Sequence, residues 1–474
     1  MEAVGLLTFI LAVIVFLASK YYGQSSSSST DRGRQPTVKV RDPAVARRAL
    51  IDQADAFSNR PATPFPVPLI TGPRRRRHSH GITTVPYGPH WRAFRSNLTA
   101  AILQPWRQGL LAPLQRDAVD ALVAGLLTRC PGDEVVIRDC PYGAVFGMLA
   151  RVCFGDGVDA RRVRSKERMM QEFRVAIGEA KVFARSTAAK LKHWRRFLAF
   201  RRRQASLFAP LIADARRRQS SGRRGGVRPY VDSLVDLRVP DENDARQRRS
   251  LTDDEMVSLV VEFLGAVESI VAVVEWTLAH LVARPEVQRK LRHEVVVAGS
   301  AASEKQRTCS GSTTTYLHAV VLESLRLHPP FPLIMRELRS GDEVIGMATG
   351  VPAAGVRVQF MLADIGKDKE LWTDPSEFRP ERFVAGGEGE GVGLVPAGGK
   401  EIRMMPFGAG QRSCPGAALG MQYIKGFLAP LVSRFEWAAL QAEGSGDGGV
   451  DMTELYGFIT VMKTPLKARM TPCV

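Results

Sequence analysis

Apolar residues recur every three to four positions through long stretches between Trp91 and Leu327, which is the period of helices that bury one face. Alternating runs, typical of strands, are short and scattered, as at Glu134–Ile137 and Val356–Met361. Beyond residue 328 the chain is rich in Pro and Gly. No segment that interrupts this pattern resembles a domain boundary. The pattern predicts a single large, mainly α domain with a minor β-sheet and a loop-rich last third.

The first apolar run differs from all later ones, because Ala3–Ser19 contains no charged residue. At about 1.5 Å per residue this helix is about 26 Å long, enough to span a thin bilayer. A cleaved signal peptide is the competing interpretation, but Glu2 replaces the usual basic start and no Ala-x-Ala pattern follows. Basic residues after the run place the N-terminus in the lumen. We therefore expect a retained transmembrane helix with the rest of the chain in the cytosol.

This anchor sets the expected organisation of the chain. Residues 1–22 are the membrane anchor, residues 23–36 form a polar tether that includes Ser25–Ser29, and residues 37–474 form the domain. Thr37–Pro43 has the pattern of a strand, and Pro43–Asp52 has the spacing of a short helix.

Charge is concentrated in one part of the chain. The whole sequence has a net charge of +18, and residues 161–230 contain 21 Lys/Arg against 4 Asp/Glu. Such a stretch suits anionic lipid headgroups. A nucleic-acid role needs a recognisable fold or aromatic residues interleaved with the basic ones, and the sequence has neither. We expect solvated helix faces near a membrane and no nucleic-acid partner.

A loop near the C-terminus contains the most specific chemistry. Its sequence runs Phe407-Gly-Ala-Gly410-Gln-Arg412-Ser-Cys414-Pro-Gly416. A thiolate in a tight glycine loop accepts backbone N–H bonds, which lower its pKa and let it bind a metal. The alternative for such a pattern is a glycine-rich turn with an incidental cysteine. The six cysteines include no Cys-x-x-Cys pair, and six in a chain of 474 residues are too few for a disulfide scaffold.

Two further charged motifs precede this loop. Glu323 and Arg326 are three residues apart within a helical pattern, so they lie on one helix face and can pair. Arg382 belongs to the sequence Pro380-Glu-Arg-Phe383. Each motif alone is compatible with an exposed charge.

Together and in this order, these residues resemble the cytochrome P450 superfamily of haem-thiolate oxygenases, in its plant microsomal branch and closest to its family eighty-nine. The resemblance implies haem b (iron protoporphyrin IX), with Cys414 as the iron ligand and Phe407, Gly410 and Gly416 shaping its loop. The remaining residues implied to bind the cofactor or support its site are Trp91, Arg95, Glu323, Arg326, Arg382 and Arg412. Of these, Arg95 and Arg412 are expected near the haem propionates, and Arg326 belongs mainly with Glu323 and Arg382.

The resemblance also implies that Ser258–Leu281 is the long helix that crosses the haem. The family pattern of glycine, acid and two alcohols is altered here to Gly265-Ala-Val-Glu268-Ser269-Ile270. Glu268 and Ser269 keep an acid beside an alcohol, the minimum for relaying protons to bound dioxygen. We predict these two as the catalytic residues. A buried apolar helix that tolerates one Glu is the alternative.

A second departure lies at the N-terminus, where the family's Pro-rich hinge and its first helix and strands are not recognisable. Thr37–Pro43 resembles a strand well inside the usual domain, so the N-terminal part of the domain is predicted to be incomplete.

The expected activity is insertion of one oxygen atom of O2 into an apolar small-molecule substrate at the endoplasmic reticulum membrane, where membrane lipid contacts the protein. NADPH supplies electrons indirectly, through NADPH–cytochrome P450 reductase, which is expected to dock near Lys400, Arg403 and Lys425. Two alternatives remain: an oxygen-independent haem isomerase or dehydratase, and a degenerate, non-catalytic family member.

Overall fold

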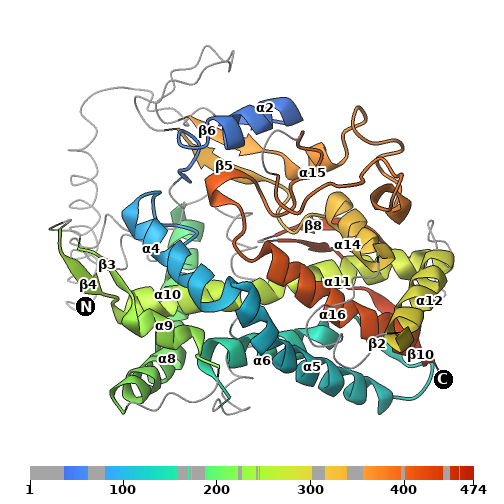
Figure 1. The fold of residues 1–474 in the computed structure, drawn as a ribbon, viewed down its shortest axis with the longest axis horizontal. Helices are drawn as coiled ribbons and strands as arrows, with labels where there is room; N and C mark the ends of the chain where they lie inside the picture. The colour runs from blue at the N-terminus through green and yellow to red at the C-terminus, as the bar shows by residue number, and fades with distance from the viewer. Residues whose placement is uncertain are drawn as a thin grey trace, which may run out of the picture.

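The computed structural model describes residues 37–61, 81–156, 169, 172, 187–221, 227–241, 244, 246–301, 315–338, 356–396, 401–440, 449–457 and 459–473. The predicted anchor and tether, residues 1–36, lie outside the described residues. Within this part, helices make up most of the chain and four small sheets lie around them (Figure 1). The mainly α fold with a minor β component is confirmed.

Most of the helices lie between Trp91 and Leu327, where the apolar spacing predicted them. The α-helices are α2 (Pro43–Arg47), α4 (Pro89–Leu98), α5 (Pro105–Leu127), α6 (Asp139–Phe154), α8 (Thr187–Ser220), α9 (Tyr230–Asp236), α10 (Asp253–Leu264), α11 (Ala266–Ala283), α12 (Pro285–Ala301), α14 (Thr315–Leu327), α15 (Leu362–Gly366) and α16 (Ala417–Arg434). Tighter or wider helical turns are η1 (Arg48–Asp52), η3 (Thr99–Leu103), η4 (Pro380–Phe383) and η5 (Gly410–Arg412).

The strands are short and form four separate sheets. They are β1 (Thr37–Val40), β2 (Glu134–Val136), β3 (Arg238–Pro240), β4 (Arg248–Ser250), β5 (Ile334–Glu337), β6 (Arg357–Phe360), β7 (Phe435–Ala439), β8 (Glu454–Tyr456), β9 (Thr460–Met462) and β10 (Lys467–Pro472). One sheet has the order β1-β6-β5, with β1 parallel and β5 antiparallel to β6, and a second has the order β2-β10-β7. The hairpins β3–β4 and β8–β9 complete the set.

The strands predicted at Glu134–Ile137, Val356–Met361 and Thr37–Pro43 are confirmed as β2, β6 and β1, each within one to three residues. The helix expected at Pro43–Asp52 is present as α2 followed by η1. The β3–β4 hairpin was not predicted, because its three-residue strands are too short to show an alternating pattern.

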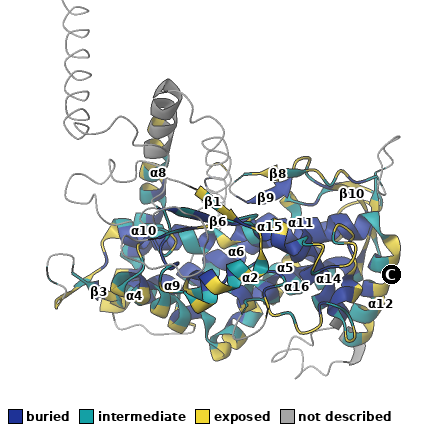
Figure 2. Ribbon diagram, turned by 90° about the horizontal axis from the view of Figure 1, so that it is seen from above, coloured by how far each residue is buried: buried dark blue, intermediate teal, exposed yellow. Residues whose placement is uncertain are grey.

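The centre of the fold is the nearly continuous pair α10 and α11, which meet at Gly265. A capping box at Thr252 and Glu255 starts α10, and almost every residue of α11 is buried. Figure 2 shows both helices mostly in the colour of buried residues. Among the described residues, Asp253–Ala283 is the one helical stretch apolar and long enough to cross a membrane. A helix apolar on all sides that packs on α6, α14 and α16 is a core helix.

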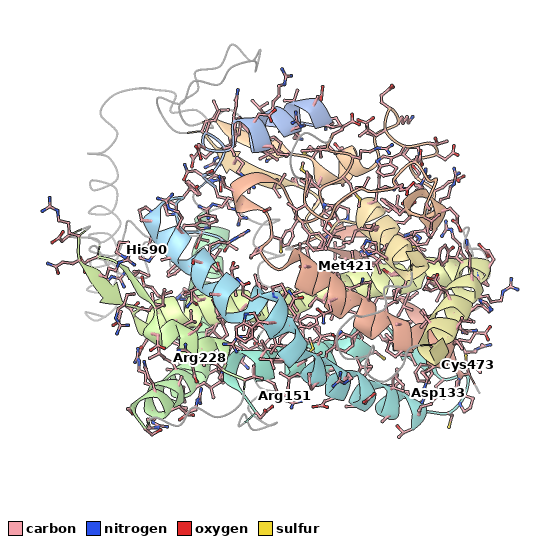
Figure 3. The ribbon with its side chains drawn as sticks, viewed as in Figure 1. His90, Asp133, Arg151, Arg228, Met421 and Cys473 are labelled. Carbon is pink, nitrogen blue, oxygen red and sulfur yellow. The ribbon has the colours of Figure 1, made fainter. Side chains whose placement is uncertain are left out.

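A smaller core connects the β1-β6-β5 sheet to the C-terminal loop. Apolar side chains of α2, η1 and the sheet pack against the residues that precede Cys414. The buried members on the loop side are Ile402, Met405 and Ala409. The sheet therefore positions one side of the loop while α16 continues the chain from its end, and Met421 marks α16 in Figure 3.

Ion pairs neutralise part of the basic stretch. Five described arginines between residues 203 and 228 pair with carboxylates, several of which lie outside that stretch. The pairs are Arg203–Glu172, Arg216–Asp253, Arg217–Asp214, Arg218–Asp232 and Arg228–Asp236. The surface of α8 is therefore less positive than the sequence of residues 161–230 alone suggests.

Candidate functional site

The loop around Cys414 is a tightly closed turn. Gly408 and Gly410 have φ angles of 71° and 70°, in the left-handed region that favours glycine. A Cβ at Gly410 would lie 2.0 Å from the carbonyl oxygen of Leu50, so no other residue fits there. The N–H of Cys414 donates to the carbonyl of Phe407 at 2.8 Å, and Gly416 begins α16. The five residues singled out in this loop thus build one structure.

The Cys414 thiol lies deep in the protein but is open on one side. Part of the surface of Cys414 is exposed, whereas the many protein atoms around its thiol raise the pKa of that thiol. A thiol on the wall of a cavity is both accessible and surrounded in this way. The backbone N–H of Gly416 and the charges of Arg95 and Arg60 lower the same pKa, which favours the thiolate. Metal coordination deprotonates a thiol outright.

Four arginines form a cluster beside this thiol. Arg336 and Arg412 are buried and Arg60 and Arg95 are half-buried. Burial lowers the pKa of all four, and the mutual repulsion of the guanidinium groups also lowers it for Arg60, Arg336 and Arg412, so that the pKa is about 9 for Arg336 and Arg412. The Glu262 carboxylate raises the pKa of Arg60 and Arg412, but among the described residues none of the four forms a salt bridge with a carboxylate. We call these four residues the arginine cluster; one carboxylate near four guanidinium groups leaves excess positive charge, which favours an anionic ligand.

Two members of the arginine cluster, Arg60 and Arg336, were not predicted from the sequence. Arg336 occupies an inward position of β5 and is only 1% exposed. An arginine at the buried register of a short apolar strand is a signal that could have identified it. Arg60 follows η1 by eight residues and has no comparable pattern around it.

Trp91 completes this side of the site. Its ring lies 5.7 Å from the Arg95 guanidinium and 4.7 Å from that of Arg412. Its buried Nε1 has no hydrogen-bond partner among the described residues. A thiolate donor, several guanidinium groups and an unpaired indole N–H match the iron and the two propionate groups of a haem. The residues present therefore fit the cofactor that the sequence predicted.

Arg412 already has partners within the protein. Its Nε, Nη1 and Nη2 donate to the carbonyls of Ser58, Ile82 and Val85 at 2.9, 2.9 and 2.7 Å. Arg95 donates from Nη1 to the carbonyl of Ser413 at 2.6 Å. Since a guanidinium has five N–H donors, both keep donors for an anion.

Glu323, Arg326 and Arg382 form a separate network. Both carboxylate oxygens of Glu323 accept from Arg326 at 2.7 Å, and Oε1 also accepts from Arg382 at 3.2 Å. Arg326 also donates to the carbonyls of Gly366, Pro375 and Glu377. All five of its N–H donors are thus used inside the protein, which leaves none for a cofactor. Any part that Arg326 plays in haem binding is indirect.

The connection from this network to the cysteine loop runs through Trp372. The guanidinium groups of Arg326 and Arg403 lie 5.2 and 4.5 Å from the Trp372 ring centroid. Trp372 Nε1 donates to the carbonyl of Arg403 at 3.2 Å. Arg403 precedes Phe407 by four residues, so the network supports the beginning of the loop.

The two predicted catalytic residues lie on different faces of α11. Ser269 is half-buried and continues a stripe that contains Glu262 and the exposed Ala266, as the spacing of three to four residues requires. Glu268 is 5% exposed on the neighbouring face and accepts a hydrogen bond from the Tyr142 hydroxyl at 2.6 Å. Ile270 is buried. Consecutive helical residues point about 100° apart, so the alcohol and the acid face different surroundings.

The predicted docking face is described only in part. Lys400 lies outside the described residues, and Arg403 and Lys425 are half-buried. Beside the cysteine loop, a cavity of about 540 Å³ is lined by residues that include Arg92, Arg95 and Ser413. The basic residues that line this cavity, Arg92 and Arg95, are on α4.

The sequences of known proteins identify the family to which this site belongs. The cytochrome P450 family profile matches residues 11–448. Cytochrome P450 89A9 of Arabidopsis thaliana is 34% identical over 452 residues, which cover 93% of this chain and 85% of that protein. Germacrene A hydroxylase of Tanacetum parthenium is 28% identical, with coverage of 96% and 88%.

Solved structures share the fold. A zebrafish cytochrome P450 structure with abiraterone superimposes with a TM-score of 0.71 at 21% identity and covers 98% of this chain and 99% of its own. The fold, the cysteine loop and the family match agree. The chain belongs to the cytochrome P450 family, near the plant family 89, and is a monooxygenase-type oxidoreductase.

Proposed function

We propose that this protein is a membrane-anchored haem-thiolate monooxygenase that inserts one atom of O2 into an apolar small molecule, with electrons from NADPH through a reductase. The observation that supports it most is the Cys414 thiol near Arg60 and Arg95, with Arg336 and Arg412 next to Arg60 and none of the four in a salt bridge with a carboxylate among the described residues. One thiolate and several cations match one haem b.

Bound haem supplies the chemistry of oxygen activation, and a thiolate ligand favours O–O cleavage by donating electron density. This chain's residues bind and orient the group. Cys414 holds the iron, and Arg95, Arg336 and Arg412 neutralise the propionates together with the Trp91 N–H. The Glu323 network supports the cysteine loop without contacting the cofactor.

Ser269 is the residue that we assign to proton delivery on the open stripe of α11. Its hydroxyl can hold a water molecule by donating and accepting. Glu268 is buried and accepts a hydrogen bond from Tyr142, so we assign it as a proton donor on that face of α11. The hydroxyl of Tyr142 is its first contact in that direction.

The substrate is assigned as apolar from exposed apolar residues on two elements. Phe331 and Met335, before and within β5, are 39% and 41% exposed, and β5 belongs to the sheet that packs against the cysteine loop; Ala266 is exposed on α11. Exposed large apolar side chains next to a functional site indicate an apolar ligand. Two relatives support the class: their names state that they hydroxylate germacrene A and oxidise amorpha-4,11-diene.

Electron delivery is assigned to the cavity beside the cysteine loop, where Arg92 and Arg95 supply positive charge for an acidic reductase surface. Residues 1–22 would anchor the protein in the endoplasmic reticulum, so that lipid and reductase are in the same membrane.

Reconstituted turnover tests the proposal. The full-length protein in vesicles with NADPH–cytochrome P450 reductase should oxidise a sesquiterpene hydrocarbon only when NADPH and O2 are both present. An oxygen-independent isomerase or dehydratase would instead convert a fatty-acid hydroperoxide without reductase or NADPH. A haem-loaded protein that consumes neither NADPH nor hydroperoxide, with a panel of apolar compounds, would contradict the proposal and favour a degenerate member.

A further inference from the structure

Residues 81–85, which we call the clamped segment, are held by three charged side chains from distant parts of the chain. Glu262 of α10 accepts from the backbone N–H groups of Ile82 and Thr83 at 2.7 and 3.2 Å, and from the Thr83 hydroxyl. Arg412, which belongs to the cysteine loop, donates hydrogen bonds to the carbonyls of Ile82 and Val85. The segment therefore bridges the central helix and the cysteine loop.

A third contact links the clamped segment to the arginine cluster. Arg60 donates from Nη1 to the carbonyl of Thr83 at 3.1 Å, and the Glu262 charge acts on both Arg60 and Arg412. Two of the four arginines of the cluster are thus bonded to a segment that Glu262 fixes in place. Bonds between an ionised group and backbone groups are the strong class of hydrogen bond.

Gly81 packs so closely against the Glu262 carboxylate that a side chain at residue 81 would collide with it. A Cβ on Gly81 would lie 2.2 Å from Oε1 and 2.5 Å from Cδ of Glu262. Gly81 is buried and has no unusual φ angle, so the neighbouring carboxylate is the reason for the absence of a side chain. Gly81 and Glu262 are therefore complementary in shape.

We infer that Glu262 is a positioning residue: through the clamped segment it fixes Arg60 and Arg412 beside Cys414, and so holds the anionic groups of the cofactor in place. The inference rests on the proposed function, because it names haem as the ligand. The carboxylate acts without touching the cofactor. Loss of its charge releases Ile82 and Thr83, and Arg412 then loses two of its three backbone partners.

Hydrogen exchange of the full-length protein tests the clamp itself. In Glu262→Gln an NH2 donor replaces one of the two carboxylate oxygens, so one backbone N–H loses its acceptor and the bond of the other loses its charge. Exchange at Ile82 and Thr83 should therefore be about tenfold to hundredfold faster. Glu275→Gln is the matched control. Glu275 is buried on the same long helix and accepts from Arg138 and the Leu466 N–H, far from this segment in sequence. Unchanged exchange at residues 82–83 in Glu262→Gln, or equal acceleration in the control, would overturn the clamp.

A paired substitution tests the shape of the clamp. Gly81→Ala alone should expose residues 82–83, whereas in the Glu262→Ala background the same change should add nothing, because the conflicting carboxylate is gone. Additive effects of Gly81→Ala and Glu262→Ala would contradict the inference.

A third experiment tests the effect on the cofactor by measuring the rate at which haem transfers from the protein to excess apomyoglobin. Glu262→Gln should release haem about tenfold faster than the wild type, Glu262→Asp should restore part of the retention, and Glu275→Gln should leave it unchanged. If exchange accelerates but haem release does not, the positioning role is wrong although the clamp is real. If the wild type binds no haem, the proposed function fails, and the exchange result still decides the clamp.

Discussion

Two sets of arginines support the region of the cysteine loop, and they differ in what balances their charge. Arg326 and Arg382 share the carboxylate of Glu323, and Arg326 uses every N–H donor inside the protein. In the arginine cluster, burial and mutual repulsion lower the pKa of Arg336 and Arg412, and no carboxylate among the described residues pairs with them.

The difference separates a structural site from a binding site. A network whose donors are all satisfied needs no ligand and serves to hold loops together. A cluster of buried cations is unfavourable until an anion arrives, so part of the binding energy of that anion is the relief of this cost. The sequence presents both sets as arginines in loops and strands, and only the structure distinguishes them.

The largest expected effect is loss of the Glu323 network. Arg326→Met should lower the free energy of unfolding by about 3–5 kcal/mol, because it leaves the Glu323 carboxylate buried without its main partner. Urea denaturation measures the change. Lys467→Ala removes the exposed pair with Glu134 and serves as the control, with an expected cost below about 1 kcal/mol. Equal effects of the two substitutions would show that burial does not distinguish these pairs.

Arg336→Met should give the opposite result. Replacing an unpaired buried cation by an apolar side chain of similar length leaves the unfolding free energy of the haem-free protein unchanged or raises it by about 1 kcal/mol. Haem transfer to apomyoglobin should meanwhile accelerate about tenfold to hundredfold, as one charge-assisted bond is lost. Destabilisation of the haem-free protein to the same extent as in Arg326→Met would remove the distinction between the two sets.

A histidine pair beside the Glu323 network should respond to pH. The Nε2 atoms of His280 and His328 lie 3.0 Å apart, and His328 Nδ1 lies 2.6 Å from Glu454 Oε1. Burial lowers the pKa of both imidazoles, and Lys367 and Arg326 lower it further. Glu454 offsets only part of this effect for His328.

The folded protein therefore binds fewer protons than the unfolded chain, whose histidines titrate near about 6.5. Stability is fully present above that pH and falls as the pH drops below it, by up to about 1.4 kcal/mol per pH unit for each histidine. Denaturation of the wild type and His280→Gln between pH 7 and pH 5 measures this. The variant should have a shallower slope, and parallel slopes would contradict the assignment.

The smallest expected effect concerns the open stripe of α11, where Ser269 presents a neutral hydroxyl instead of a charge. Ser269→Thr should increase the ratio of product to NADPH consumed by about twofold, because the added methyl restricts χ1 and fixes the hydroxyl. Ser269→Ala should lower the ratio and produce more peroxide, with haem content unchanged in both. Three equal ratios would make Ser269 a packing residue.

Local patterns predicted what neighbouring residues build together. The spacing of Gly410, Arg412 and Cys414 within one turn indicated a metal-binding thiolate, and Glu323 with Arg326 indicated a helix-face pair. Contacts across the chain were beyond such reasoning. Arg336 approaches Arg60 and Arg412 from a strand distant in sequence, and Glu262 contacts Ile82 across 180 residues. The sequence also shows Arg412 only as a cation near the cysteine, whereas the fold gives it three carbonyl partners.

The carbon-monoxide difference spectrum of the reduced protein tests the central claim most directly, since it reports the ligand of the haem iron. We predict a thiolate-type spectrum for the full-length protein and its loss, or loss of haem altogether, in Cys414→Ala. Cys153→Ala, which alters a buried cysteine of α6, should keep the spectrum. A thiolate spectrum that persists in Cys414→Ala, or that disappears in Cys153→Ala alone, would contradict the account.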